Sequence, residues 1–230
     1  MVMELAIKYF IVFVEAGLLL PIFLAIKNRA FWKNNITLKS LSLLLLVSFV
    51  QLCIVIPQDL INIAGYDTPN TIFYYNWQYV ITAFIKLYIY YTLLNFSFKK
   101  ILIGGFVLVL LFFIGLEFKN DSLTFYNTQQ FVTNTYLIVN LFIIILSLLY
   151  AFQQLQDLTV EDITKYSFFW LNAGFLVYHF GSIFVYSFVG NGAVQLDAVV
   201  AWVVNGLVLL SLYIAISFAY YYSPNLTQDS

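Results

Sequence analysis

Three side chains that can change their charge lie deep inside long apolar stretches of this chain: Glu15, Lys86 and His179. The whole chain has only ten Lys or Arg and eleven Asp or Glu among 230 residues. A charge at the centre of a bilayer costs about 2.5–3.5 kcal/mol on insertion scales, so such residues usually face the interior of a helix bundle. A carboxylate, an amine and an imidazole placed there could bind an ionic ligand or transfer protons.

Two interpretations of these residues stay open. Glu15 and His179 are expected near the midplane, with Lys86 about 5 Å nearer the cytoplasm. A Glu15–Lys86 pair could belong to a proton relay or an ionic-ligand site, or it could be a buried ion pair that only joins two helices. His179 could likewise be a ligand or proton carrier, or a hydrogen-bonded packing residue.

The composition predicts an integral membrane protein. Hydrophobic residues make up 63% of the chain and charged residues 9%, against about 45–50% and about 25% in soluble domains. The net charge of −1 supplies no basic surface for nucleic acid. One histidine and one cysteine cannot form a structural zinc site, which takes four nitrogen or sulfur ligands, and no cofactor is expected.

Seven apolar stretches are long enough to cross a bilayer core of about 30 Å, which needs about 20 residues of helix. They cover roughly residues 4–26, 40–64, 71–95, 100–118, 129–153, 166–190 and 196–221. No long polar linker separates them, so we expect one all-α transmembrane domain over residues 1–230. The stretch over residues 100–118 is almost purely apolar and is expected to face lipid.

Positive charges in the connecting loops predict the orientation. The first, third and fifth loops together hold seven basic residues, which are Lys27, Arg29, Lys33, Lys39, Lys99, Lys100 and Lys165. The loops on the other side hold only Lys119. Because cytoplasmic loops carry the excess of Lys and Arg, we expect the N-terminus outside and the C-terminus in the cytoplasm.

Polar residues form one line along each of four stretches, because residues seven apart lie nearly on one helical face. The lines are Glu4, Lys8 and Glu15; Tyr75, Tyr79, Thr82, Lys86 and Tyr90; Thr133, Asn140, Ser147 and Gln154; and Asn172, His179, Ser182 and Tyr186. Such lines belong inside a bundle, where polar groups can bond to one another.

Three further polar residues fall near the predicted outer ends of helices: Asp59, Asn76 and Asp197. They could form the rim of an outward-facing cavity, and simple solvated helix ends explain them equally well. The predicted site therefore comprises Glu15, Lys86, Asn172, His179, Tyr186, Asp59, Asn76 and Asp197.

Known catalytic and chromophore motifs are not found in the sequence. It contains no Ser–His–Asp constellation and no HExxH motif, so no enzymatic activity is expected. Seven-helix retinal proteins attach their chromophore to a lysine of the last helix, and the stretch over residues 196–221 has none.

The sixth stretch contains Phe169, Trp170, Asn172, Gly174, Tyr178, Gly181 and Phe184. This pattern resembles one in uncharacterised seven-helix membrane proteins of Bacteroidota, which are similar to the membrane sensor regions of some histidine kinases. The seventh stretch departs from the pattern, because Asn205 stands where two asparagines would be expected. The resemblance implies a sensor or accessory protein of the bacterial inner membrane that works with a two-component kinase.

The sequence therefore predicts a membrane sensor or accessory protein. A small or lipid-like ligand would bind in an outward-opening cavity, and a partner protein would read the change at the cytoplasmic ends of the helices. Two alternatives remain, a small-solute or proton-coupled transporter and a structural subunit of a larger membrane complex.

Overall fold

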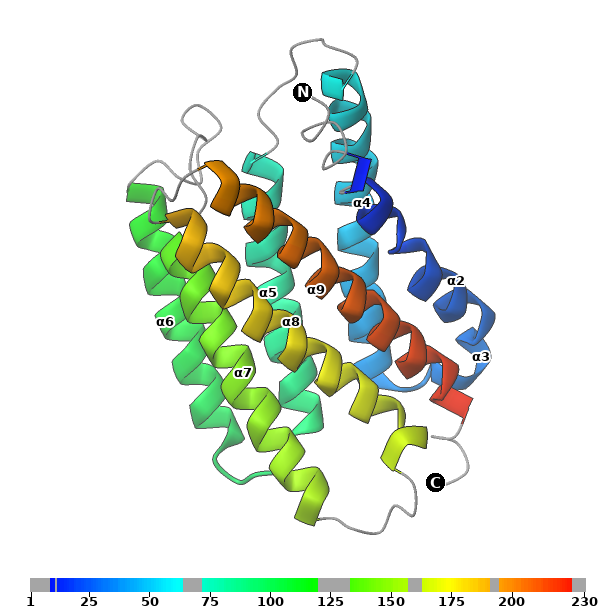
Figure 1. The fold of residues 1–230 in the computed structure, drawn as a ribbon. Coiled ribbons are helices and arrows are strands. Elements are labelled where there is room, and N and C mark those ends of the chain that lie inside the picture. Colours follow the sequence, from blue (N-terminus) through cyan, green and yellow to red (C-terminus); the bar gives the residue numbers. More distant parts are fainter. Residues whose placement is uncertain are drawn as a thin grey trace.

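The protein is a bundle of long helices that run up and down its length (Figure 1). The computed structural model describes residues 9–10, 12–63, 72–119, 133–156, 163–190 and 195–224, and no strand occurs within these ranges. Its helices are α2 (Leu19–Lys27), α3 (Arg29–Trp32), α4 (Ile36–Ile63), α5 (Ile72–Leu93), α6 (Lys99–Lys119), α7 (Thr133–Gln156), the 3₁₀ turn η1 (Ile163–Lys165), α8 (Ser167–Gly190) and α9 (Gln195–Tyr221).

Six of the predicted stretches each coincide with one helix, from α4 to α9, and their ends differ by at most four residues. Five of these helices are long and apolar enough to cross a membrane: α4, α6, α7, α8 and α9. Helix α5 is not among the five, because tyrosines and other polar residues lower its mean hydropathy. The protein therefore has the helices of a multi-pass membrane protein.

The first predicted stretch is not one continuous helix. Residues 12–16 are helical, a turn follows at Gly17 and Leu18, and α2 begins at Leu19. Pro21 has no N–H to donate to the carbonyl of Gly17, which instead accepts a bond from the Leu20 N–H at 3.3 Å. The expectation of a single helix over residues 4–26 was therefore wrong within the described residues.

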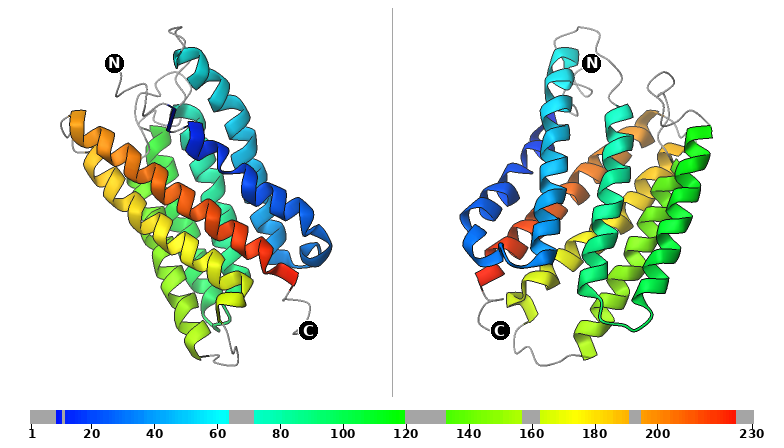
Figure 2. Two further views of the ribbon diagram at one scale, coloured as in Figure 1. Left: turned by 45° about the vertical axis from the view of Figure 1, so that its right-hand side comes forward. Right: turned by 180° about the vertical axis from the view of Figure 1, so that it is seen from behind.

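Helices α8 and α9 pack closely through two glycines of α8. A Cβ atom added at Gly174 would lie 2.5 Å from the Ala215 Cβ, and one added at Gly181 would lie 2.5 Å from a methyl group of Val208. Figure 2 shows the two helices side by side along most of their length. The seven-residue spacing of the glycines thus serves close helix packing.

The end of α9 is joined to the beginning of the chain by Tyr220. The Asn28 side chain donates a hydrogen bond to the Tyr220 carbonyl at 2.7 Å, and the rings of Trp32 and Tyr220 lie 5.7 Å apart. The Tyr220 hydroxyl lies 2.7 Å from that of Ser42 and donates to the Leu38 carbonyl at 3.2 Å. We call this group, Tyr220 with Asn28, Trp32, Leu38 and Ser42, the C-terminal latch.

Several contacts place the loops with basic residues at the same end of the bundle as this latch. Three hydrogen bonds lie there: the Ser167 hydroxyl donates to the Ala219 carbonyl, the Thr37 hydroxyl bonds that of Thr92, and the Asn95 N–H donates to the Gln153 side chain. These contacts bring together the starts of α4 and α8 with the ends of α5, α7 and α9, which form the lower end in Figure 1. The seven basic residues of the first, third and fifth loops therefore share one end, whereas Lys119 ends α6 at the other.

Helix α6 lies at the edge of the bundle (Figure 1). Only 17% of its apolar window is buried, against 33% to 50% in the other four helices of this kind. Its main ring contact with α7 is a stack of Phe106 on Phe142, with centroids 3.8 Å apart. It is thus the least buried of the five, as expected of a helix that faces lipid.

Candidate functional site

The predicted polar lines of α5, α7 and α8 meet inside the bundle and form two layers of hydrogen bonds. In the upper layer the Tyr79 hydroxyl donates to the Asn140 Oδ1 at 3.0 Å and lies 3.2 Å from the Tyr136 carbonyl. The Asn140 Oδ1 also lies 2.5 Å from the His179 Nδ1. Asn140 and His179 are completely buried, so a single amide joins α5 to α8.

The lower layer repeats this arrangement with other residues. The Tyr90 hydroxyl lies 2.5 Å from the Ser147 hydroxyl and donates to the Asn172 Oδ1 at 2.9 Å. The Asn172 amide nitrogen donates to the Ser147 carbonyl at 3.1 Å. Each layer therefore takes one tyrosine from α5 and one polar residue each from α7 and α8.

Helical geometry fixes the distance between the layers. Asn140 and Ser147 are seven residues apart on α7, and so are Asn172 and His179 on α8, which corresponds to a rise of about 10 Å. The two helices run in opposite directions, so their polar residues stay in register. Lys86 lies between Tyr79 and Tyr90 on α5, so its backbone is placed between the two layers.

Lys86 is enclosed by aromatic rings. Its side chain is 4% exposed, and its Nζ lies 5.7 Å from the centroid of the Tyr79 ring and 5.2 Å from that of Tyr178. No hydrogen bond of this Nζ occurs within the described part of the chain. A desolvated cation–π contact contributes about 2 kcal/mol, whereas burying an ammonium group without a counter-ion costs several kcal/mol. The charged form of Lys86 is therefore under-compensated.

Two buried nitrogen atoms of the upper layer have no hydrogen-bond partner in the described residues: the His179 Nε2 and the Asn140 Nδ2. An amide oxygen only accepts, so with the Asn140 Oδ1 facing the ring the His179 Nδ1 donates to it, and the neutral imidazole carries a lone pair at Nε2. The Asn140 Nδ2 keeps N–H donors to offer. Buried polar groups in proteins nearly always find partners, so these atoms are suited to a bound molecule.

Glu15 lies at a different level from Lys86. Its carboxylate accepts a hydrogen bond from the Tyr75 hydroxyl at 2.7 Å. Tyr75 precedes Lys86 by eleven residues on α5, which is about 16 Å along the helix. The Glu15–Lys86 pair stays a prediction: the Glu15 carboxylate bonds the Tyr75 hydroxyl, and the Lys86 Nζ lies against the rings of Tyr79 and Tyr178.

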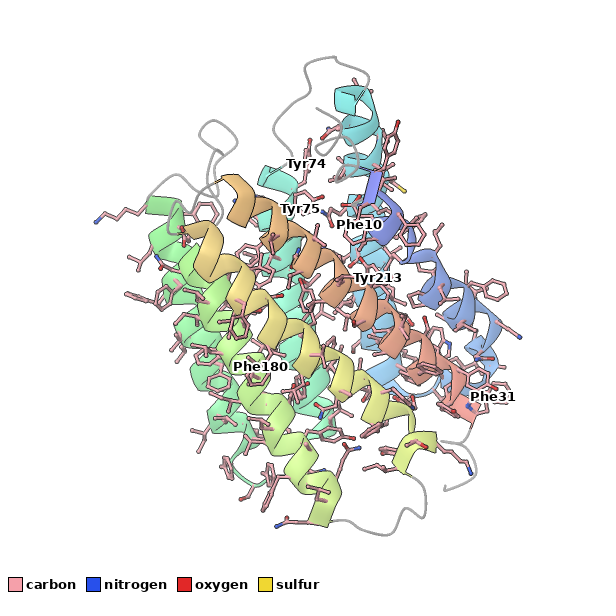
Figure 3. The ribbon with its side chains drawn as sticks, viewed as in Figure 1. Phe10, Phe31, Tyr74, Tyr75, Phe180 and Tyr213 are labelled. Atoms are coloured by element: carbon pink, nitrogen blue, oxygen red, sulfur yellow. The ribbon has the colours of Figure 1, made fainter. Side chains whose placement is uncertain are left out.

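Tyrosines connect the two levels. Tyr213 of α9 lies within electrostatic range of both Glu15 and Tyr178, and Tyr178 contacts Lys86. Lys86 in turn lies within electrostatic range of His179. Figure 3 shows Tyr75 near the upper end of α5 and Tyr213 about midway along α9. Tyr178 is thus a neighbour of both Lys86 and His179, whose ring lies 5.0 Å from its own.

The structure brings three of the eight predicted site residues together, since Lys86, Asn172 and His179 all belong to or border the two layers. Glu15 is buried near them but on another level. Asn76 is fully buried, so it is not a solvated helix end. The side chains of Asp59, Tyr186 and Asp197 lie outside the described residues.

The predicted set left out several residues that build the layers. Tyr79, Tyr90, Asn140 and Ser147 occupy the predicted polar lines, and the meeting of three such lines was the signal that could have selected them. Tyr178 and Tyr213 belong to no such line, and they resemble the many other tyrosines of the chain. Their role depends on how α8 and α9 pack.

The layers can bind a polar molecule or transfer protons. No group of three or more His, Cys, Asp or Glu side chains that could hold a metal ion occurs among the described residues. The site instead offers one ammonium group, an amide N–H and an imidazole lone pair, enclosed by tyrosine rings. Comparisons with protein-family models, with curated proteins and with solved structures each found no match for this chain.

Proposed function

We propose that this chain is a seven-helix membrane sensor that binds a small ligand at Lys86, Asn140 and His179. The observation that carries the proposal is a pair of buried nitrogen atoms that have no partner among the described residues, the Asn140 Nδ2 of α7 and the His179 Nε2 of α8. Polar groups in this position are costly to keep in a membrane bundle, so their retention favours a binding role. In a bacterium the membrane would be the inner membrane and the reader of the signal a two-component kinase.

The proposed orientation has seven crossings, with the N-terminus outside and the latch end in the cytoplasm. It is supported by the gathering of seven basic loop residues at the latch end and by the positive-inside rule. A fluorescent protein fused after Ser230 is expected to be fluorescent, because it folds in the cytoplasm, whereas alkaline phosphatase fused at the same place is expected to be inactive. Active phosphatase at Ser230 would contradict this orientation.

The signal would pass from α8 to α9. Tyr178 and His179, at the candidate site, are part of α8, and Gly174 and Gly181 of the same helix are in tight contact with α9. A ligand that displaces α8 would therefore also shift α9, whose Tyr220 belongs to the C-terminal latch. Such a ligand must bind the two arrangements with different affinity.

Hydrogen exchange of the purified protein in lipid nanodiscs tests the sensor proposal. A panel of small acids, alcohols, amines and lipids is first screened for compounds that raise the thermal stability. We expect any such compound to change the exchange of the last turns of α9 as well as that of α8. A ligand that protects the site and leaves the latch unchanged would contradict signalling through α9.

A proton-coupled transporter is the second candidate, and one observation favours it. The bundle buries three titratable groups, Glu15, Lys86 and His179, and such groups inside a membrane bundle often belong to a path for protons. Solute uptake into proteoliposomes under a pH gradient, abolished by Glu15→Gln, would establish transport and refute the sensor proposal. The absence of gradient-driven uptake for every compound that binds would refute transport.

A further inference from the structure

The chemistry of the upper layer narrows the class of ligand. Lys86 supplies one positive charge, and its backbone lies about three helical turns from that of Tyr75, whose hydroxyl bonds the Glu15 carboxylate. One cation is matched by one negative charge, whereas a dianion would bring a second charge that no described neighbour of Lys86 balances. The N–H groups of Asn140 Nδ2 also require an acceptor.

The His179 Nε2 has the opposite requirement. Its lone pair needs a hydrogen-bond donor, and a simple carboxylate has none to offer. A hydroxyl group on the same molecule would supply it. The rings of Tyr79 and Tyr178 flank Lys86, so the hydrocarbon part of a bound molecule would meet apolar surfaces.

We propose that the Lys86–Asn140–His179 site binds a small hydroxylated monocarboxylate. The carboxylate accepts from the Lys86 ammonium and the Asn140 N–H, and the hydroxyl donates to the His179 Nε2. This inference rests on the proposed function only in using the same site. It adds the two chemical groups by which a ligand would be recognised.

The test is calorimetric titration of the nanodisc protein with 2- and 3-hydroxybutyrate, butyrate and the corresponding hydroxybutyramides. We expect at least one hydroxybutyrate to bind about tenfold more tightly than butyrate, because butyrate leaves the buried His179 Nε2 without a donor. The neutral amides should bind more weakly still, since they lack the charge-assisted bond to Lys86. The proposal would be overturned if butyrate bound with the same affinity as both hydroxybutyrates, or if the amides bound with the same affinity as the acids.

Two variants assign each ligand group to its residue. Lys86→Met should abolish the preference for acid over amide, and His179→Phe should abolish the preference for hydroxybutyrate over butyrate. Lys99→Met is the matched control, because the Lys99 Nζ also lies 5.2 Å from a tyrosine centroid, that of Tyr91, but bonds the Leu94 carbonyl outside the polar layers. We also expect Lys86→Met to raise the melting temperature of the ligand-free protein, because it removes an under-compensated buried charge.

The outcomes separate this inference from the sensor proposal. If a neutral or basic compound binds and shifts the latch, the sensor proposal is supported and the proposed hydroxycarboxylate ligand is wrong. Binding of hydroxybutyrate without any change at the latch would sustain the ligand class and refute signalling. If none of the compounds binds, water suffices as the partner of these nitrogens and the inference fails.

Discussion

Replacing Gly174 by leucine is expected to separate α8 from α9 and to lower the free energy of unfolding by about 3 kcal/mol or more. The first added carbon alone would lie 2.5 Å from the Ala215 Cβ and 3.3 Å from a methyl group of Leu212. The Ala215 Cβ cannot move without moving the backbone of α9. Reversible unfolding in mixed micelles measures the change, and Gly174→Ala should show a smaller loss in the same direction.

Gly104→Leu on α6 is the matched control for this prediction. A Cβ added at Gly104 meets no atom within 4 Å, so the leucine would extend into lipid. Leucine is also the better helix former by almost 1 kcal/mol, so we expect this variant to be neutral or slightly more stable. Equal losses from Gly104→Leu and Gly174→Leu would show that the close approach of α8 and α9 does not limit stability.

Replacing Asn140 by leucine is expected to cause the second large loss, about 2 kcal/mol. A hydrogen bond between membrane helices contributes only about 0.6 kcal/mol on average. The Asn140 Oδ1, however, is the acceptor for both Tyr79 and His179, and a buried donor left without an acceptor costs about 1–3 kcal/mol. Leucine has nearly the same size, so the loss reports the polar contacts rather than a cavity.

Asn134→Leu, at the exposed start of the same helix, should change stability by less than about 0.5 kcal/mol. A double-mutant cycle then isolates the contact with His179. In the Asn140→Leu background, His179→Phe should cost about 1 kcal/mol less than in the natural protein. Additive losses would show that the Asn140–His179 bond does not stabilise the bundle.

Periodicity in the sequence predicted the helices and the faces on which the polar groups lie. Six apolar stretches became single helices because each combines helical length with an apolar surface that either packs or faces lipid. The polar line of α5 with Tyr79, that of α7 with Asn140 and that of α8 with His179 all face the interior. Polar groups in a membrane bundle must form hydrogen bonds with one another. The position of these residues on each helix could therefore be read from their spacing.

The pairing between helices could not be read in the same way. Depth estimates treat every stretch as a straight helix, and the turn at Gly17 before Pro21 removes that assumption for Glu15. A lysine is also expected to seek a carboxylate, yet Lys86 lies against two tyrosine rings. Which side chains surround Lys86 depends on the relative tilt and packing of three helices. The spacing of residues along one helix does not contain this information.

The C-terminal latch has a consequence for how the protein is made. The contact between Asn28 and Tyr220 joins residues 192 positions apart, so the ribosome must synthesise the chain as far as Tyr220 before it can form. Until α9 is synthesised, α2, only nine residues long, can pack only against α4. A chain that stops before Tyr220 would lack the contact that holds Asn28, beside α2, and we expect quality-control proteases to degrade it faster.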